Sequence, residues 1–169
     1  MVKEFAAKIL AAKEAKVDPD FMLIARIEAL ISGSGMIEAL KRADAYEKAG
    51  ADAILIHSKQ KEPDEIFEFA ESWKGSVPIV AIPTTYDSVK ISELSEHNIK
   101  MVIYANQTLR TAHSSMFRLL KEMNHAERIS DVTEKMSSMQ DIFELQEMYD
   151  IKNKEKDLER ELKKLGYIN

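Results

Sequence analysis

The side chains best suited to chemistry come just after two short apolar runs. Arg26 and Glu28 follow the first run, and His57 and Ser58 follow the second. A guanidinium at a strand end can clamp a carboxylate or phosphate through two parallel hydrogen bonds. An imidazole there can transfer a proton or donate a hydrogen bond to an anion. An ion pair between Arg26 and Glu28 and a histidine satisfied by a backbone carbonyl are the structural alternatives, and position alone leaves both open.

Two other candidates for chemistry have weaker support. The segment 32–35, Ser-Gly-Ser-Gly, precedes a predicted helix, where glycine-rich loops can hold phosphate. Its spacing fits neither the P-loop nor the dinucleotide fingerprint, which favours a simple turn into the helix. His97, His113 and His125 lack metal-ligand spacing, and no carboxylate pair stands at the predicted strand ends. We therefore expect no metal site in this chain.

An alternation of apolar runs and amphipathic segments positions these residues. Unbroken apolar runs between turn residues are typical of strands covered on both faces, and helical periodicity fills the intervals. Four βα units preceded by a helix predict an α/β fold with a parallel sheet, because parallel strands need crossover connections. Ligands bind at the carboxyl ends of such strands. The predicted strands are 21–25, 53–56, 78–82 and 101–104, and the predicted helices are 2–16, 36–49, 63–74, 91–97 and 108–123.

The chain changes character after residue 124. We expect a half-barrel of four βα units over 1–124 and a helical extension over 125–169. Within the extension, Leu158, Leu162 and Leu165 form a narrow apolar stripe on a highly charged helix. Such a stripe suits packing against a partner surface, and a solvated terminal helix is an equally good interpretation.

Composition narrows the class of protein. The 169 residues include 24 Lys and Arg against 29 Asp and Glu, for a net charge of −5. This balance argues against a nucleic-acid binder, and the absence of cysteine excludes disulfides and thiolate chemistry. No apolar run approaches the roughly 20 residues that cross a bilayer, and Lys8, Lys13 and Glu14 interrupt any signal-peptide core. We expect a cytoplasmic protein that binds neither nucleic acid nor membrane.

Several motifs together resemble the phosphoenolpyruvate phosphomutase family of the isocitrate lyase superfamily. The resemblance extends through about residue 150. Its motifs are Ala25-Arg26-Ile27-Glu28-Ala29, Ser32-Gly33-Ser34-Gly35, Glu38-Ala39-Leu40-Lys41-Arg42-Ala43, Ala49-Gly50-Ala51-Asp52-Ala53-Ile54, His57-Ser58, Pro83-Thr84 and Ala105-Asn106.

This resemblance implies a fold and an activity. The fold is a TIM-type (β/α)8 barrel in a homo-oligomer, with a swapped C-terminal helix that maps to the extension. The activity is interconversion of phosphoenolpyruvate and phosphonopyruvate, with Mg²⁺ holding the pyruvyl part. By the same resemblance Arg26 and His57 bind the phosphoryl group, with Glu28 and Ser58 as possible rim contacts. Phosphonopyruvate hydrolase is a close relative and stays an alternative.

The chain departs from the family in its number of strands. A complete barrel has eight strands, whereas the four predicted here match the second half of the family's barrel. The family's Mg²⁺-binding carboxylates, catalytic Asp and gating loop belong to the first half, so we expect no catalytic residue and no Mg²⁺ ligand in this chain. We expect a truncated or separately encoded half that is inactive alone and needs a second copy or a complementary half-barrel. A non-catalytic assembly module is the remaining alternative.

Overall fold

The computed structural model describes residues 2–168, and the chain divides into two compact units between Gln107 and Thr108. This division lies at the start of helix α5 (Gln107–Met123), of which no residue is buried. The domain boundary after residue 124 stays a prediction. Each unit is described by itself.

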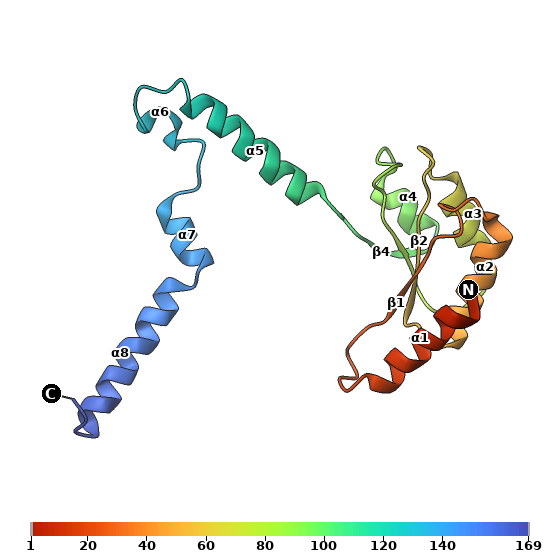
Figure 1. Ribbon diagram of the computed structural model, residues 1–169, viewed down its shortest axis with the longest axis horizontal. Coiled ribbons are helices and arrows are strands. Elements are labelled where there is room, and N and C mark those ends of the chain that lie inside the picture. Colours follow the sequence, from red (N-terminus) through yellow and green to blue (C-terminus); the bar gives the residue numbers. More distant parts are fainter. Residues whose placement is uncertain (1, 169) are drawn as a thin grey trace. The chain divides into compact units, whose positions relative to one another are not determined.

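A four-stranded parallel sheet forms the centre of the first unit (Figure 1). The strands pair in chain order, so β1 and β4 are the edges. Each strand forms at or beside its predicted run, but two are shifted. β1 begins and ends later than predicted because Phe21 and Met22 are exposed and precede the pairing, so Arg26 lies within β1 and not after it, and β4 begins and ends earlier than predicted. The strands are β1 (Ile24–Ile27), β2 (Ala53–Ile56), β3 (Ile79–Ala81) and β4 (Ile99–Val102).

The helices of the first unit connect these strands as predicted. Two residues that end helices have the expected left-handed backbone: Gly50, with a φ of 101°, and Asn98, with a φ of 61°. Both conformations turn the chain from a helix into the next strand. Pro63 precedes α3, where its fixed φ suits a helix start. The helices are α1 (Val2–Ala15), α2 (Gly35–Lys48), α3 (Asp64–Ser72) and α4 (Ile91–Glu96).

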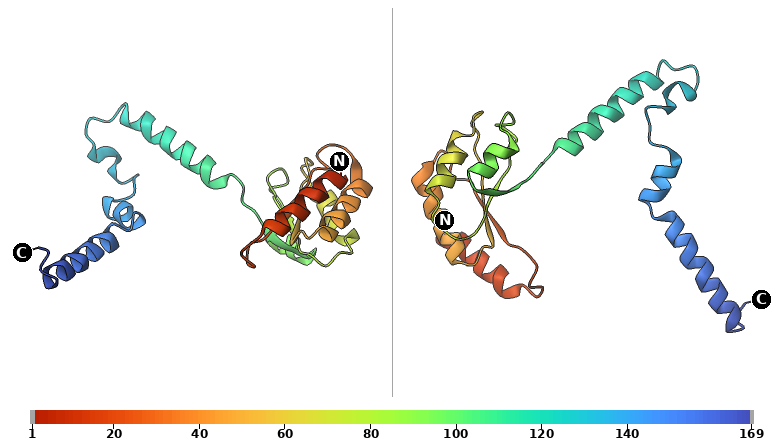
Figure 2. Two further views of the ribbon diagram at one scale, coloured as in Figure 1. Left: turned by 60° about the horizontal axis from the view of Figure 1, so that its bottom comes forward. Right: turned by 180° about the vertical axis from the view of Figure 1, so that it is seen from behind.

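The two faces of the sheet are covered unequally. One face, which we call the covered face, packs its strand residues against all four helices in a single apolar core (Figure 2). The opposite face, which we call the open face, carries a small cluster of its own, and no residue of that cluster comes from a described helix. Side chains alternate along a strand, so neighbouring residues belong to opposite faces. The open-face cluster contains Ala53, Leu55, Val80 and Ile82, with Ile103 packed against it.

The second unit consists of helices with little core. Val132 is its only buried apolar residue among those described, and the predicted stripe on the last helix is exposed at Leu158 and Leu165. Glu147, which adopts a left-handed φ of 53°, separates the last two helices of this unit. The elements are α5, α6 (Ser130–Thr133), α7 (Met139–Leu145) and α8 (Met148–Lys164). Across residues 2–168, no helix combines the length and apolarity needed to span a membrane.

Candidate functional site

Arg26 and His57 occupy the same face and the same end of the sheet. Arg26 pairs with Leu55, an open-face residue, and the alternating burial of β1 leaves Arg26 exposed while Ile27 is buried. His57 follows β2 directly and lies two residues beyond Leu55, which returns it to the open face. Two neighbouring strands therefore deliver a cation and an imidazole to the carboxyl edge of the sheet.

An ion pair orients the guanidinium. The Nε of Arg26 donates to the Oε1 of Glu28, and both side chains are nearly half exposed. Within the described residues neither Nη group of Arg26 makes a hydrogen bond, so the outer edge of the guanidinium keeps its donors available. The Arg26–Glu28 ion pair considered as a structural alternative is therefore present. It leaves the two Nη groups of Arg26 available to a ligand.

The imidazole of His57 is held neutral. Burial lowers its pKa below the ordinary 6.5, and the positive charge of Arg26 lowers it further, while Glu28 and a hydrogen bond with the Ile82 backbone act in the opposite direction. This influence of Arg26 agrees with the position of the two groups at neighbouring strand ends. The buried Nδ1 of His57 has no hydrogen-bond partner among residues 2–168. Leaving such an atom unpaired costs about 1–3 kcal/mol, a cost that a bound ligand can remove.

A cleft reaches Arg26 from the edge of the sheet. Its volume is about 270 Å³. Arg26 and Glu28 line this cleft together with residues of α1 and α2. His57, which follows β2, does not line it. The other lining residues are Glu4, Phe5, Lys8, Arg42 and Tyr46.

Ser58 differs from the rim contact that the sequence suggested. Its side chain is completely buried, and its hydroxyl donates a hydrogen bond to the Oε2 of Glu65 in the first turn of α3. The same hydroxyl accepts a hydrogen bond from the Gln60 N–H at 3.0 Å. Because its polar atoms are engaged in the interior, Ser58 supports the loop after β2 and does not line the rim.

Sequence reasoning missed the carboxylate and the threonine that hold this loop. Thr85, after β3, donates its hydroxyl to the Ser58 carbonyl at 2.8 Å. Glu65 stands seven residues beyond Ser58 on the next helix. An acidic residue in the first turn of a helix is explained by the helix dipole alone, so its sequence position gave no separate signal.

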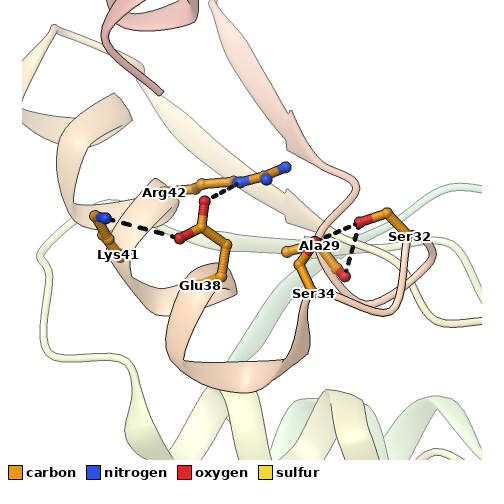
Figure 3. Close-up of polar contacts among 6 residues, drawn as sticks. All are labelled: Ala29, Ser32, Ser34, Glu38, Lys41 and Arg42. Carbon is orange, nitrogen blue, oxygen red and sulfur yellow. Dashed lines mark hydrogen bonds and ion pairs between the residues drawn. The ribbon is translucent and has the colours of Figure 1, made fainter. Parts of the chain in front are cut away.

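The serine- and glycine-containing segment 32–35 forms a turn closed on itself (Figure 3). The Ser32 hydroxyl donates to the Ala29 carbonyl at 3.1 Å and lies 2.9 Å from the Ser34 hydroxyl. Its glycines have φ values of 73° and 80°, which side chains rarely adopt. Glu38, one turn into α2, pairs with Arg42 at 2.9 Å. The polar groups of this region satisfy one another, in agreement with the simple turn favoured from the sequence.

The donor set does not fit a metal ion. Over the part of the chain that the structure describes, no three His, Asp or Glu side chains gather closely enough to hold one. Arg26 and His57 present hydrogen-bond donors and positive charge, which suit an anion.

A parallel sheet with covering helices and polar groups at the carboxyl ends of its strands defines an α/β protein built from βα units. The family model described as phosphoenolpyruvate phosphomutase matches residues 1–124, and the chain belongs to that family.

Relatives of known activity are similar over most of this chain. A phosphoenolpyruvate phosphomutase of Tetrahymena pyriformis is 41% identical over 155 residues, which cover 92% of this chain and 52% of the relative. A phosphonopyruvate hydrolase of Variovorax sp. (strain Pal2) is 44% identical over 146 residues, which cover 86% and 50%. The chain spans about half the length of these relatives.

Solved structures agree with this assignment. The phosphoenolpyruvate phosphomutase from Streptomyces platensis subsp. rosaceus superposes with a TM-score of 0.88 at 40% identity, covering 93% of this chain and 55% of that one. A phosphonopyruvate hydrolase in complex with oxalate and Mg²⁺ gives 0.86 at 42% identity, covering 90% and 54%. The predicted fold class, parallel βα units of a TIM-type barrel followed by C-terminal helices, is confirmed.

Proposed function

We propose that this chain supplies the phosphoryl-binding part of an enzyme that interconverts phosphoenolpyruvate and phosphonopyruvate. The observation that carries the proposal is the meeting of Arg26 and His57 at neighbouring strand ends on one face of the sheet. The relatives named phosphoenolpyruvate phosphomutase support it, since the chain is about 40% identical to them across both polar motifs.

The two side chains suit the charge of a migrating phosphoryl group. In the forward direction the P–O bond of the enol phosphate breaks and a P–C bond forms, and negative charge spreads over the three remaining phosphoryl oxygens. The free Nη groups of Arg26 can donate two parallel hydrogen bonds to these oxygens. His57, held close by and neutral, adds a short-range polar contact without repelling Arg26. Donors fixed in advance stabilise developing charge at little reorganisation cost.

The proposal requires further βα units. The open face of the sheet is half exposed at Ile24 and Met101, with exposed fractions of 37% and 41%, and β1 and β4 end the sheet without partners. We propose that a second copy or a complementary half-barrel closes this face. A related hydrolase binds Mg²⁺ and oxalate. In the proposed enzyme any such ion is held by residues of the completing half.

The need for completion has a direct test. We expect no reaction when phosphonopyruvate is incubated with this chain and Mg²⁺ and followed by ³¹P NMR. Appearance of an enol phosphate signal would contradict the requirement for further units. Appearance of free phosphate would instead support the second candidate, phosphonopyruvate hydrolase, which the 44% identical relative favours.

The role of the two side chains is tested by binding. We expect phosphonopyruvate to shift the amide signals around 26–28 and 57–59 in a ¹⁵N NMR titration of the whole chain. Arg26→Lys should weaken binding at least tenfold, because a point charge does not replace a two-pronged fork, and His57→Asn should weaken it less. Arg160→Lys, on the exposed surface of α8, is the matched control. Equal affinity in Arg26→Lys and wild type would remove Arg26 from the site.

A further inference from the structure

We propose that Glu65 and Thr85 are positioning residues that fix His57 for its ligand by clamping the residue that follows it. The clamp consists of Ser58, Glu65 and Thr85, and we call it the Ser58 clamp. This inference rests on the proposed function, because it assigns the clamp to the phosphoryl-binding histidine.

The clamp holds Ser58 from two directions. On the side-chain side, the Ser58 hydroxyl donates to the Glu65 carboxylate, and a hydrogen bond to an ionised acceptor is stronger than a neutral one. On the backbone side, the Ser58 carbonyl accepts from the Thr85 hydroxyl at 2.8 Å. Ser58 is completely buried, so its own polar atoms are shielded from water. With its hydroxyl and carbonyl engaged, the Ser58 side chain and the Ser58–Lys59 peptide have little freedom to rotate, which restrains the backbone next to His57.

The same clamp connects the two loops that surround the imidazole. Thr85 belongs to the loop after β3, and that loop begins at Ile82, whose backbone acts on the pKa of the His57 ring. The Thr84 N–H donates to the Ile82 carbonyl at 2.8 Å and closes the turn between them. Ser58 therefore restrains the backbone next to His57, and Thr85 ties Ser58 to the loop that begins at Ile82.

A purely structural clamp makes a different prediction. A structural role requires only that the loop after β2 stays attached to α3, and any loss then appears as reduced stability alone. A positioning role requires that the imidazole itself responds when the clamp opens. Arg26 and Glu28 are the charged groups that act on the ring, and neither is part of the clamp. A change at Glu65 or Thr85 can therefore reach His57 only through the loop or through water entering beside it.

The imidazole can be observed directly in the whole chain. The ¹⁵N signals of the His57 ring are assigned by their loss in His57→Asn. They report the tautomer of the ring and its pH titration without any ligand. In Glu65→Ala and Thr85→Val we expect the His57 midpoint to rise towards the ordinary value, since a loosened loop admits water to a ring whose pKa burial had lowered. Glu65→Gln should remain close to wild type, because its amide oxygen still accepts from Ser58. The matched controls are Glu68→Gln, exposed on the same helix, and Ser88→Ala, exposed in the same loop.

Thermal unfolding of every variant separates local from global effects. Thr85 is an exposed residue, so Thr85→Val is expected to fold even if Glu65→Ala does not. An unchanged titration midpoint of His57 in folded Thr85→Val overturns the positioning role of Thr85, and an unchanged midpoint in folded Glu65→Ala overturns that of Glu65. A midpoint shift in Glu68→Gln as large as that in Glu65→Ala overturns the role of Glu65 as well.

Ligand binding then distinguishes this inference from the function on which it rests. We expect Thr85→Val to weaken phosphonopyruvate binding about 3- to 10-fold, the size of one net hydrogen bond. If Thr85→Val moves the His57 signals but His57→Asn binds phosphonopyruvate as tightly as wild type, the clamp does not serve the ligand and the inference is overturned. The binding role of Arg26 is then judged separately from Arg26→Lys. If wild type shows no binding at all, the proposed function fails for this chain, and the imidazole titration alone decides whether the clamp positions His57.

Discussion

The two faces of the central sheet have different tasks although they are made from alternating residues of the same strands. On β1, Ile27 is completely buried on the covered face, whereas Ile24 and Arg26 on the open face are exposed. The covered face packs against four helices, and the open face of the described sheet receives none.

The difference between the faces separates stability from chemistry. Hydrophobic burial contributes about 25 cal/mol per Å² of apolar surface, so the covered face supplies most of the folding free energy. The open face contributes less to stability and carries the polar groups of the candidate site at one end. Replacements on the covered face should therefore leave ligand binding nearly unchanged, and replacements on the open face should leave the free energy of unfolding nearly unchanged.

The largest expected effect lies in the covered face. Phe69 is completely buried between α3 and the sheet. We expect Phe69→Ala to lower the free energy of unfolding by about 3–5 kcal/mol, the usual cost of an aromatic cavity. Urea unfolding measures it. Ile24→Ala on the open face, where the side chain is 37% exposed, should cost much less. Similar losses in the two variants would contradict the comparison.

An intermediate effect is expected at the opposite end of the strands. The carboxylate of Asp52 accepts hydrogen bonds from the Lys13 ammonium and the Leu23 N–H, both at 2.9 Å. These contacts, with that of Lys13 the larger, lower the pKa of Asp52. Asp52→Asn should reduce stability by about 1 kcal/mol, because the ion pair is partly exposed and weakens in water. Asp87→Asn, in an exposed loop, is the control. If both variants unfold at the same urea concentration, this contact does not stabilise the fold.

The smallest effect is a pH dependence from the candidate site. Folding lowers the pKa of His57 below 6.5, so the unfolded chain binds more protons in the interval between the two values. Stability should then fall as the pH drops through 6.5 into that interval. His57→Asn should flatten this part of the curve. The carboxylates Glu47 and Asp52, whose pKa values are lowered, act only below about pH 4.5. An identical slope between pH 5 and 6.5 in wild type and variant would mean that His57 is not buried as described.

Much of the architecture followed from local patterns. The apolar runs and the helical periodicity predicted the strands and the helices, because each depends on a few neighbouring residues. The exposure of α5 could not be predicted in this way, since its amphipathic pattern is the same whether its apolar face is covered or exposed. The Ser58 clamp was also missed, because its members lie seven and twenty-seven residues apart and meet only across two loops.

Periodicity and motif spacing are encoded locally, so they were enough to predict the order of strands and helices, the family, and an arginine and a histidine near strand ends. The face that each of these side chains occupies, the contact of Glu28 with Arg26 and the inward turn of Ser58 to Glu65 depend on the folded chain. Register and burial are set by which strands pair and what packs over them, and those contacts join residues far apart along the chain.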